Sequence, residues 1–362
     1  MSSSIKSFFQ TLIYSVIIIL FFSASIAFAV PVNTAKETDS SKIHLKIITD
    51  EADQVLSILK KRSMDQQITD DDWKSLFSSE GYLRLKKREQ SMKRAFTDEE
   101  FKLFVLSDTL LQKKGSLEQT LKQWKKADLN AMAKRALKYL PEGASIKAKI
   151  YPVIKPRTNS FVFEMDKDPA IFLFIDPSKT KDKFENTVTH ELHHIGYALS
   201  CESSEMAKDS LLNENARITV NWIGAFGEGF AMLAAAGSPD IHPHTFSSQE
   251  DRKRWDKDVS NFNNDLKDLE KFFLDILDKK LTKEEIEEKG FSFMGTTQGP
   301  WYTVGYKMSV VIEKIFGYQK LIWCICNLKD LLPTYNEAAA KYNSAHGEHL
   351  AMWSKDLLEK IK

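Results

Sequence analysis

Cysteine is scarce in this chain of 362 residues, which contains three: Cys201, Cys324 and Cys326. An odd number cannot be fully paired within one chain. Cys324 and Cys326 are two residues apart in an expected helix, and residues at that spacing do not face one another. We therefore expect buried, apolar, unpaired cysteines and no disulfide framework.

An excess of charge of either sign is also missing. The chain carries 51 basic and 50 acidic residues, a formal net charge of +1. This balance argues against a nucleic-acid-binding protein and against attraction to an anionic membrane. Partners must therefore be sought at specific sites. The length allows one large domain or two smaller lobes.

Charged residues are nearly missing from the N-terminus. Lys6 is the only charged residue before Lys36, and an almost wholly apolar stretch covers residues 12–22. The small-x-small pattern at residues 27–29 is typical of signal peptidase sites, so residues 1–29 are predicted to be a signal peptide cleaved after Ala29. The mature protein would then be periplasmic or secreted. The alternative is an uncleaved membrane anchor over residues 11–30.

The remaining chain predicts an α+β fold that is mainly helical. We expect an N-terminal helical region over residues 30–143, with helical periodicity from Ile43 to Leu140 and a capping box that begins at Thr97. Residues 144–240 should form a central core and residues 241–362 a C-terminal helical region that completes a cleft. In the last region, residues 252–280 are expected to form one long, charged helix, and helices should continue from Trp301 to the end.

The expected core starts with a small sheet. Residues 148–154, 161–165 and 171–175 are rich in aromatic and β-branched residues and are separated by turn-forming residues, which predicts strands. A helix from about Thr180 to Leu199 should follow. The sheet would therefore lead directly into this helix and pack on it.

The expected helix carries the segment His190-Glu191-Leu192-His193-His194. His190 and His194 are four residues apart, so they share a helix face and can hold one metal ion. Glu191 lies beside them as a general base for metal-activated water. This pattern predicts a zinc metallopeptidase. The alternative is a surface helix with accidental histidines. His193 is expected to pack or to support the ligands.

Two histidines leave a catalytic zinc ion one protein ligand short. Glu228 is the best candidate, because it is a lone acid in an apolar, glycine-rich stretch where an unpaired carboxylate would be costly to bury. The glycines on both sides of it should permit close packing against the motif helix. The alternative role of Glu228 is an interaction with a helix dipole. Glu214 is the second candidate, in more polar surroundings. His242 and His244 could also bind metal, although their proline-containing loop is more typical of an exposed segment.

The motif, followed by the segment Glu228-Gly229-Phe230-Ala231, resembles the gluzincin metallopeptidases. The resemblance covers residues 171–317, and the nearest match is an uncharacterised bacterial family of predicted zinc-dependent peptidases. It implies that residues 144–240 form a zincin-like catalytic core and that Glu228 is the third zinc ligand. It also implies that residues 171–175 form the edge strand that pairs with substrate. Residues 300–305 resemble the Tyr-x-x-Gly segment of gluzincin aminopeptidases, which assigns the oxyanion donor to Tyr302, with Tyr306 as the alternative.

Two departures from the gluzincin pattern matter. The Gly-Met-Glu-Asn motif that holds a substrate amine in aminopeptidases is absent, which puts aminopeptidase activity in doubt. Met232 also stands where some relatives carry an acid that orients a zinc histidine. The expected function is hydrolysis of peptides or proteins. The alternatives are a catalytically silent zinc-stabilised binding or scaffold protein, and a zinc hydrolase of a non-peptide amide or ester.

Overall fold

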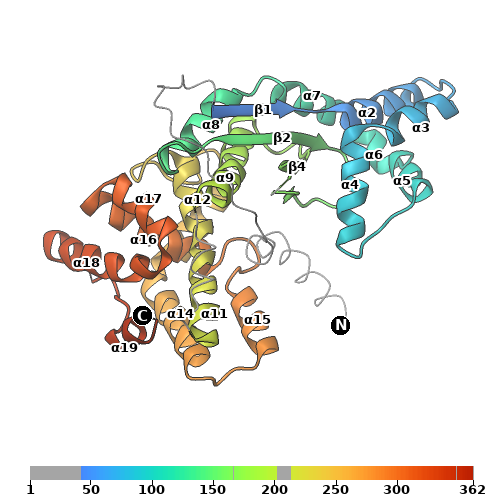
Figure 1. The fold of residues 1–362 in the computed structure, drawn as a ribbon. Helices are drawn as coiled ribbons and strands as arrows, with labels where there is room; N and C mark the ends of the chain where they lie inside the picture. Colours follow the sequence, from blue (N-terminus) through green and yellow to red (C-terminus); the bar gives the residue numbers. More distant parts are fainter. Residues whose placement is uncertain (1–41, 166, 202–212, 348, 362) are drawn as a thin grey trace, which may run out of the picture.

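The computed structural model describes residues 42–165, 167–201, 213–347 and 349–361. The expected signal peptide, residues 1–29, lies outside the described residues. The fold is α+β and predominantly helical, as predicted (Figure 1). It places helices from the N-terminal part beyond one end of a small sheet and helices from the C-terminal part on the other side of the molecule, with the helix that carries the motif between them.

From residue 42 onward, the described N-terminal part contains one strand followed by seven helices. They are β1 (Ile43–Ile47), α2 (Asp50–Ser63), α3 (Asp70–Phe77), α4 (Glu80–Ser91), α5 (Asp98–Val105), α6 (Asp108–Gln112), α7 (Lys114–Trp124) and α8 (Leu129–Lys138). The predicted capping box at Thr97 is confirmed, because the Thr97 hydroxyl accepts from the Glu100 amide and Glu100 accepts from the Thr97 amide. The helical prediction from Ile43 was wrong for β1, where half-buried and exposed residues alternate.

The sheet is completed by β2 (Ile146–Val153), β3 (Phe161–Phe163) and β4 (Ala170–Phe174), close to the three predicted strands. Its strand order is β1-β2-β4-β3, in which β3 alone is antiparallel to its neighbour. The resemblance implied that residues 171–175 form an edge strand. This was wrong, because β4 is hydrogen-bonded to β2 on one side and to β3 on the other.

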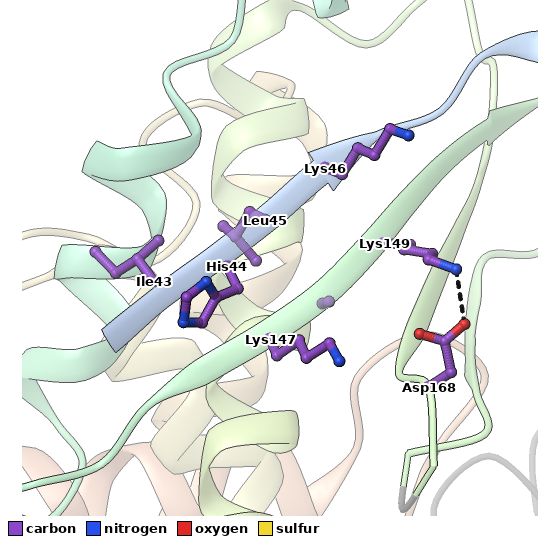
Figure 2. A pocket seen from close by; sticks show the side chains of 8 residues that line it. Ile43, His44, Leu45, Lys46, Lys147, Lys149 and Asp168 are labelled. Atoms are coloured by element: carbon purple, nitrogen blue, oxygen red, sulfur yellow. Dashed lines mark hydrogen bonds and ion pairs between the residues drawn. The ribbon is translucent and has the colours of Figure 1, made fainter. Parts of the chain in front are cut away.

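The two faces of the sheet differ in character. Ile146, Ala148 and Ile150 of β2 are buried on the face that packs against α9 (Lys181–Ser200). The opposite face carries exposed basic side chains around a hollow of about 410 Å³, in which Lys149 pairs with Asp168 (Figure 2). None of the predicted metal ligands lines this hollow.

The C-terminal half is helical throughout the described residues. Its elements are α11 (Glu214–Ile223), the 3₁₀ turn η2 (Gly224–Phe226), α12 (Gly227–Ala236), α13 (Gln249–Ser260), α14 (Phe262–Leu277), α15 (Lys283–Ser292), α16 (Pro300–Phe316), α17 (Tyr318–Cys326), α18 (Leu328–His346) and α19 (Lys355–Lys360). The single helix predicted for residues 252–280 was wrong. The chain breaks between α13 and α14 at Asn261, whose side chain bonds Asp265 and Asn264.

The stretch Glu214–Ala236 is long and apolar enough to cross a membrane by length and composition alone. However, 72% of its most apolar window is buried inside the protein. It packs against α9, α14 and α16, as expected of a buried helical segment in a folded core.

A disulfide joins Cys201, directly after α9, to Cys326 at the end of α17. The expectation of unpaired cysteines was therefore wrong for these two residues. It was right for Cys324, which is buried and free. The two bonded cysteines are 125 residues apart in the chain. Their spacing in the sequence does not reveal that they pair.

Candidate metal centre

The two histidines of the motif project from the same face of α9. The helix starts where predicted, because the Thr180 hydroxyl caps it by accepting from the Lys183 amide. The Nε2 atoms of His190 and His194 lie 3.0 Å apart. Both imidazoles are largely buried, with 13% of each side chain exposed.

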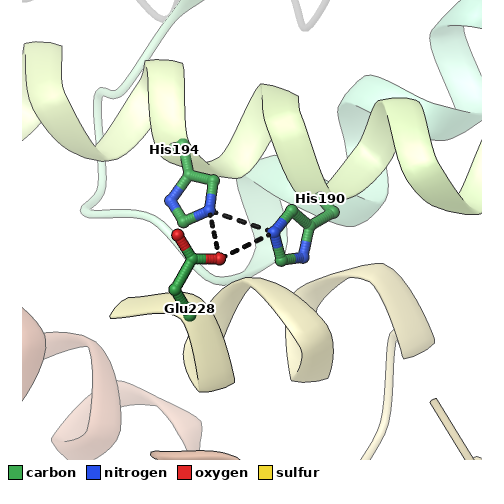
Figure 3. A group of neighbouring side chains, drawn as sticks. All are labelled: His190, His194 and Glu228. Atoms are coloured by element: carbon green, nitrogen blue, oxygen red, sulfur yellow. Dashed lines mark hydrogen bonds and ion pairs between the residues drawn. The ribbon is translucent and has the colours of Figure 1, made fainter. Parts of the chain in front are cut away.

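Glu228 completes the group from α12 (Figure 3). Its Oε2 atom lies 3.2 Å from the Nε2 atom of each histidine. Two ligands bound tetrahedrally to one zinc ion are about 3.3 Å apart, because each bond is about 2.0–2.1 Å long. The three donor atoms therefore have the spacing and the chemistry of a zinc site. No fourth His, Cys, Asp or Glu joins this group among the described residues.

Electrostatic attraction within the group lowers the pKa of Glu228 and raises that of His194. Burial opposes ionisation of Glu228, but the imidazoles of His194 and His190 lower the pKa of its carboxyl well below the usual range. Burial opposes protonation of His194, yet the Glu228 carboxylate raises the pKa of that imidazole. A buried anion between two imidazoles is the arrangement that a bound cation would stabilise further.

Glu191 lies beside the three donors without being one of them. Its side chain is half-buried. Burial raises the pKa of its carboxyl, and Glu228 adds to this effect, whereas His190 and His194 oppose it. A carboxyl beside a metal centre that is not itself one of the donors is placed to accept a proton and to return it.

Tyr302 reaches the centre from the first turn of α16. Its ring lies parallel to that of His190, with 6.3 Å between ring centroids. Burial, followed by the negative charges of Glu228 and Glu191, raises the pKa of the Tyr302 hydroxyl well above its usual value. The phenol therefore stays protonated and can act as a hydrogen-bond donor.

Comparison with known proteins identifies the family of the chain. Residues 60–344 match the family described as "Putative zinc dependent peptidase (DUF5700)". The chain belongs to this family. The zinc-dependent peptidase match spans His190, His194 and Glu228, so the family's cofactor and the donor group agree. No curated protein and no solved structure matches the chain.

The other residues considered as metal ligands lie apart from the donor group. Glu214 is exposed at the start of α11. His242 pairs with Asp256 at 2.8 Å. His244 hydrogen-bonds Ser247 and is buried, so the expectation of an exposed loop was wrong at this position. His193 packs behind the site, where burial lowers its pKa to about 3 and its Nε2 atom lies 3.3 Å from the Tyr139 carbonyl oxygen.

Two features of the site were not foreseen. The hydroxyl of Tyr306, the alternative to Tyr302, lies 3.5 Å from the Ile241 carbonyl oxygen, to which it donates. Gly229 and Gly305 allow α12 and α16 to touch, because a Cβ atom on Gly229 would lie 2.3 Å from the carbonyl carbon of Gly305. The glycines beside Glu228 were expected to pack closely against the motif helix. This was wrong, because Gly229 meets Gly305 and Tyr306 of α16 and a Cβ atom on Gly227 would meet nothing within 4 Å.

Proposed function

We propose that this protein hydrolyses peptide bonds at the centre formed by His190, His194 and Glu228. The observation that carries the proposal is the convergence of three zinc-type donors with an adjacent, half-buried carboxylate that is not a ligand. A structural zinc site is normally closed by four protein ligands, whereas a catalytic one keeps a position open. The three donors therefore favour the enzyme over a silent zinc-stabilised scaffold.

Each residue has a proposed role. The two imidazoles and Glu228 would hold a zinc ion, which would act as a Lewis acid toward water and the substrate carbonyl group. Glu191 accepts the proton of the attacking water and passes it to the departing amine. The protonated Tyr302 hydroxyl donates a hydrogen bond to the developing oxyanion, a contribution commonly worth about 3 kcal/mol.

The first test is zinc content. We expect about one zinc ion per chain in the wild-type protein, because the three donors are preformed. His194→Ala and Glu228→Ala should each lose it. Glu214→Ala is the matched control, since it removes an exposed acid on the preceding helix. Zinc retained by Glu228→Ala and lost by Glu214→Ala would transfer the ligand assignment to Glu214.

The second test separates binding from catalysis. Glu191→Gln should keep its zinc and lose about 10²–10⁴-fold in kcat on a peptide substrate, because the proton acceptor is gone. Undiminished peptide hydrolysis in a zinc-loaded Glu191→Gln protein would contradict the mechanism. Hydrolysis of amide or ester compounds, but of no peptide in a broad mixture, would favour the non-peptide hydrolase instead.

We further propose that the protein is exported and that residues 1–29 are removed. Support comes from the N-terminal sequence pattern and from the disulfide Cys201–Cys326, since disulfides persist mainly outside the cytoplasm. Mass spectrometry of the protein isolated from its host should give a mature chain that begins at residue 30. A full-length chain in the membrane fraction would instead support the uncleaved anchor.

A further inference from the structure

We propose that Lys183 forms a subsite of the metal centre that binds a carboxylate of the substrate. The proposal rests on the proposed peptidase function, because it treats the same centre as the place where a peptide is held. It adds a substrate class: peptides that carry a negative charge a few residues from the cleaved bond.

Lys183 lies on the metal-binding face of α9. It precedes His190 by seven residues, so at about 100° per residue it falls in line with the middle of the His190–His194 stripe. The rise between Lys183 and His190 is about 10.5 Å, which an extended peptide covers in about three residues. A substrate that crosses the centre toward the start of α9 can therefore bring a carboxylate to this ammonium group.

The ammonium group of Lys183 has spare donors. Its side chain is half-buried, and Nζ donates to the Ser247 hydroxyl oxygen at 2.8 Å. No carboxylate pairs with it among the described residues, although an ammonium group offers three donors. A half-buried cation with one neutral partner is under-compensated. A ligand carboxylate would supply the missing interaction.

The surroundings of Lys183 are positive as well. Burial lowers the pKa of its ammonium group, Lys179 and Arg254 lower it further, and Asp251 opposes them. That single acid is engaged by Arg254 at 2.8 Å. The local excess of cations would attract an anion and would disfavour a basic substrate residue at the same place.

A chain of polar contacts positions this group relative to the metal centre. Ser247, which receives the Lys183 hydrogen bond, is 3.0 Å from the Nδ1 atom of the buried His244. The Gln298 side chain faces the His244 ring and donates to the sulfur of Met232 at 3.4 Å. Met232 lies one helical turn after Glu228 on α12. The lysine is thus tied to the helix that provides the third donor.

The carboxylate can come from the C-terminus of a peptide or from an Asp or Glu side chain. The experiment separates these sources with N-acetylated hexapeptide mixtures in three forms. The first has a free C-terminal acid and no acidic side chain, and the second is its C-terminal amide. The third is an amide that carries one Asp or Glu. Each mixture is captured on zinc-loaded Glu191→Gln protein and quantified by mass spectrometry.

We expect one of the two acidic mixtures to bind about tenfold or more above the neutral amide, since hydrogen bonds to charged groups are the strong ones. In the Glu191→Gln background, Lys183→Met should abolish this preference and Lys183→Arg should restore part of it. Lys181→Met is the matched control, because Lys181 lies on the same helix but pairs with Glu185 at 2.8 Å. It should leave the preference intact.

Equal capture of all three mixtures, or a preference that survives Lys183→Met, would overturn the proposal. Its failure is distinguishable from failure of the proposed function. If the wild-type zinc protein cleaves neutral peptides without a carboxylate preference, the function stands and the subsite falls. If it cleaves no peptide but shows a Lys183-dependent carboxylate preference, the subsite stands as a binding site and the peptidase proposal falls.

Discussion

Gly229 of α12 and Gly305 of α16 meet backbone to backbone beside the metal centre. A Cβ atom on Gly229 would lie 2.0 Å from the Tyr306 amide nitrogen, and one on Gly305 would lie 3.2 Å from the Gly229 Cα atom. This approach brings Tyr302, on the first turn of α16, to the side of Glu228. The position of the proposed oxyanion donor therefore depends on the absence of two side chains.

Gly229→Ala should damage the centre, because the added methyl group meets backbone atoms that cannot rotate away. Separating two packed helices commonly costs about 1–3 kcal/mol or more. We expect this loss in urea unfolding, together with weaker zinc retention in dialysis against a chelator. Gly227→Ala is the matched control on the other side of Glu228, since a Cβ atom there meets nothing within 4 Å. Equal stability of both variants would show that the helix contact does not hold the site.

Tyr302→Phe and Tyr306→Phe test which hydroxyl serves the reaction. Tyr302 faces the Glu228 carboxylate, whereas Tyr306 faces the Ile241 carbonyl. Tyr302→Phe should lower kcat about 10²-fold or more with unchanged zinc content, as the loss of one oxyanion donor commonly does. Tyr306→Phe should change kcat little. The opposite order of the two effects would assign the donor to Tyr306.

The grouping of the three candidate metal ligands could be predicted from the sequence because its main determinants are local. The spacing of His190 and His194 implies a shared helix face, and the apolar surroundings of Glu228 imply a paired or coordinated carboxylate. The contact between α12 and α16 was missed, since glycines indicate a close approach but not its partner, and the motif helix was assumed to be that partner. Lys183 went unnoticed because its significance depends on Ser247, more than sixty residues away in the chain.

The fold class followed from periodicity, and the errors have identifiable causes. β1 has only five residues and precedes a long helical region, so the helical prediction was wrongly extended over its alternating pattern. The break at Asn261 lies in a charged stretch where both flanking helices have exposed polar faces. Strand order is set by contacts between distant segments, so the interior position of β4 could not be predicted from local residues.

The disulfide Cys201–Cys326 should contribute substantially to stability. It closes a loop across a sequence separation of 125 residues, and a bond over about 100 residues restricts the unfolded chain by roughly 3–5 kcal/mol. The double variant Cys201→Ser/Cys326→Ser should lose about that much in denaturant unfolding. Cys324→Ser, at the buried free thiol, is the control for loss of a sulfur atom. Thiol titration of the denatured, unreduced wild type should give one thiol, and three would contradict the bond.

Glu51 gives the N-terminal part a pH-dependent weakness. Its side chain is buried on α2, with one carboxylate oxygen accepting from the Ile154 amide at 3.0 Å and the other without a partner among the described residues. Burial, with a smaller effect from Asp50, raises its pKa to about 8, while the Ile154 amide and Lys155 oppose the shift. The folded protein thus holds this proton more tightly than the unfolded chain does.

Stability should therefore fall as the pH rises above the ordinary carboxyl range, by up to about 1.4 kcal/mol per pH unit. Above pH 7 the buried Lys155, whose pKa is lowered to about 7, contributes the opposite slope, so the clearest window is pH 5 to 7. Glu51→Gln keeps the acceptor for the Ile154 amide and removes the titration. Its advantage in free energy of unfolding over the wild type should grow by about 2–3 kcal/mol across that window. The exposed Glu142→Gln should show no such trend, and an equally flat result for Glu51→Gln would mean that Glu51 ionises normally in the folded protein.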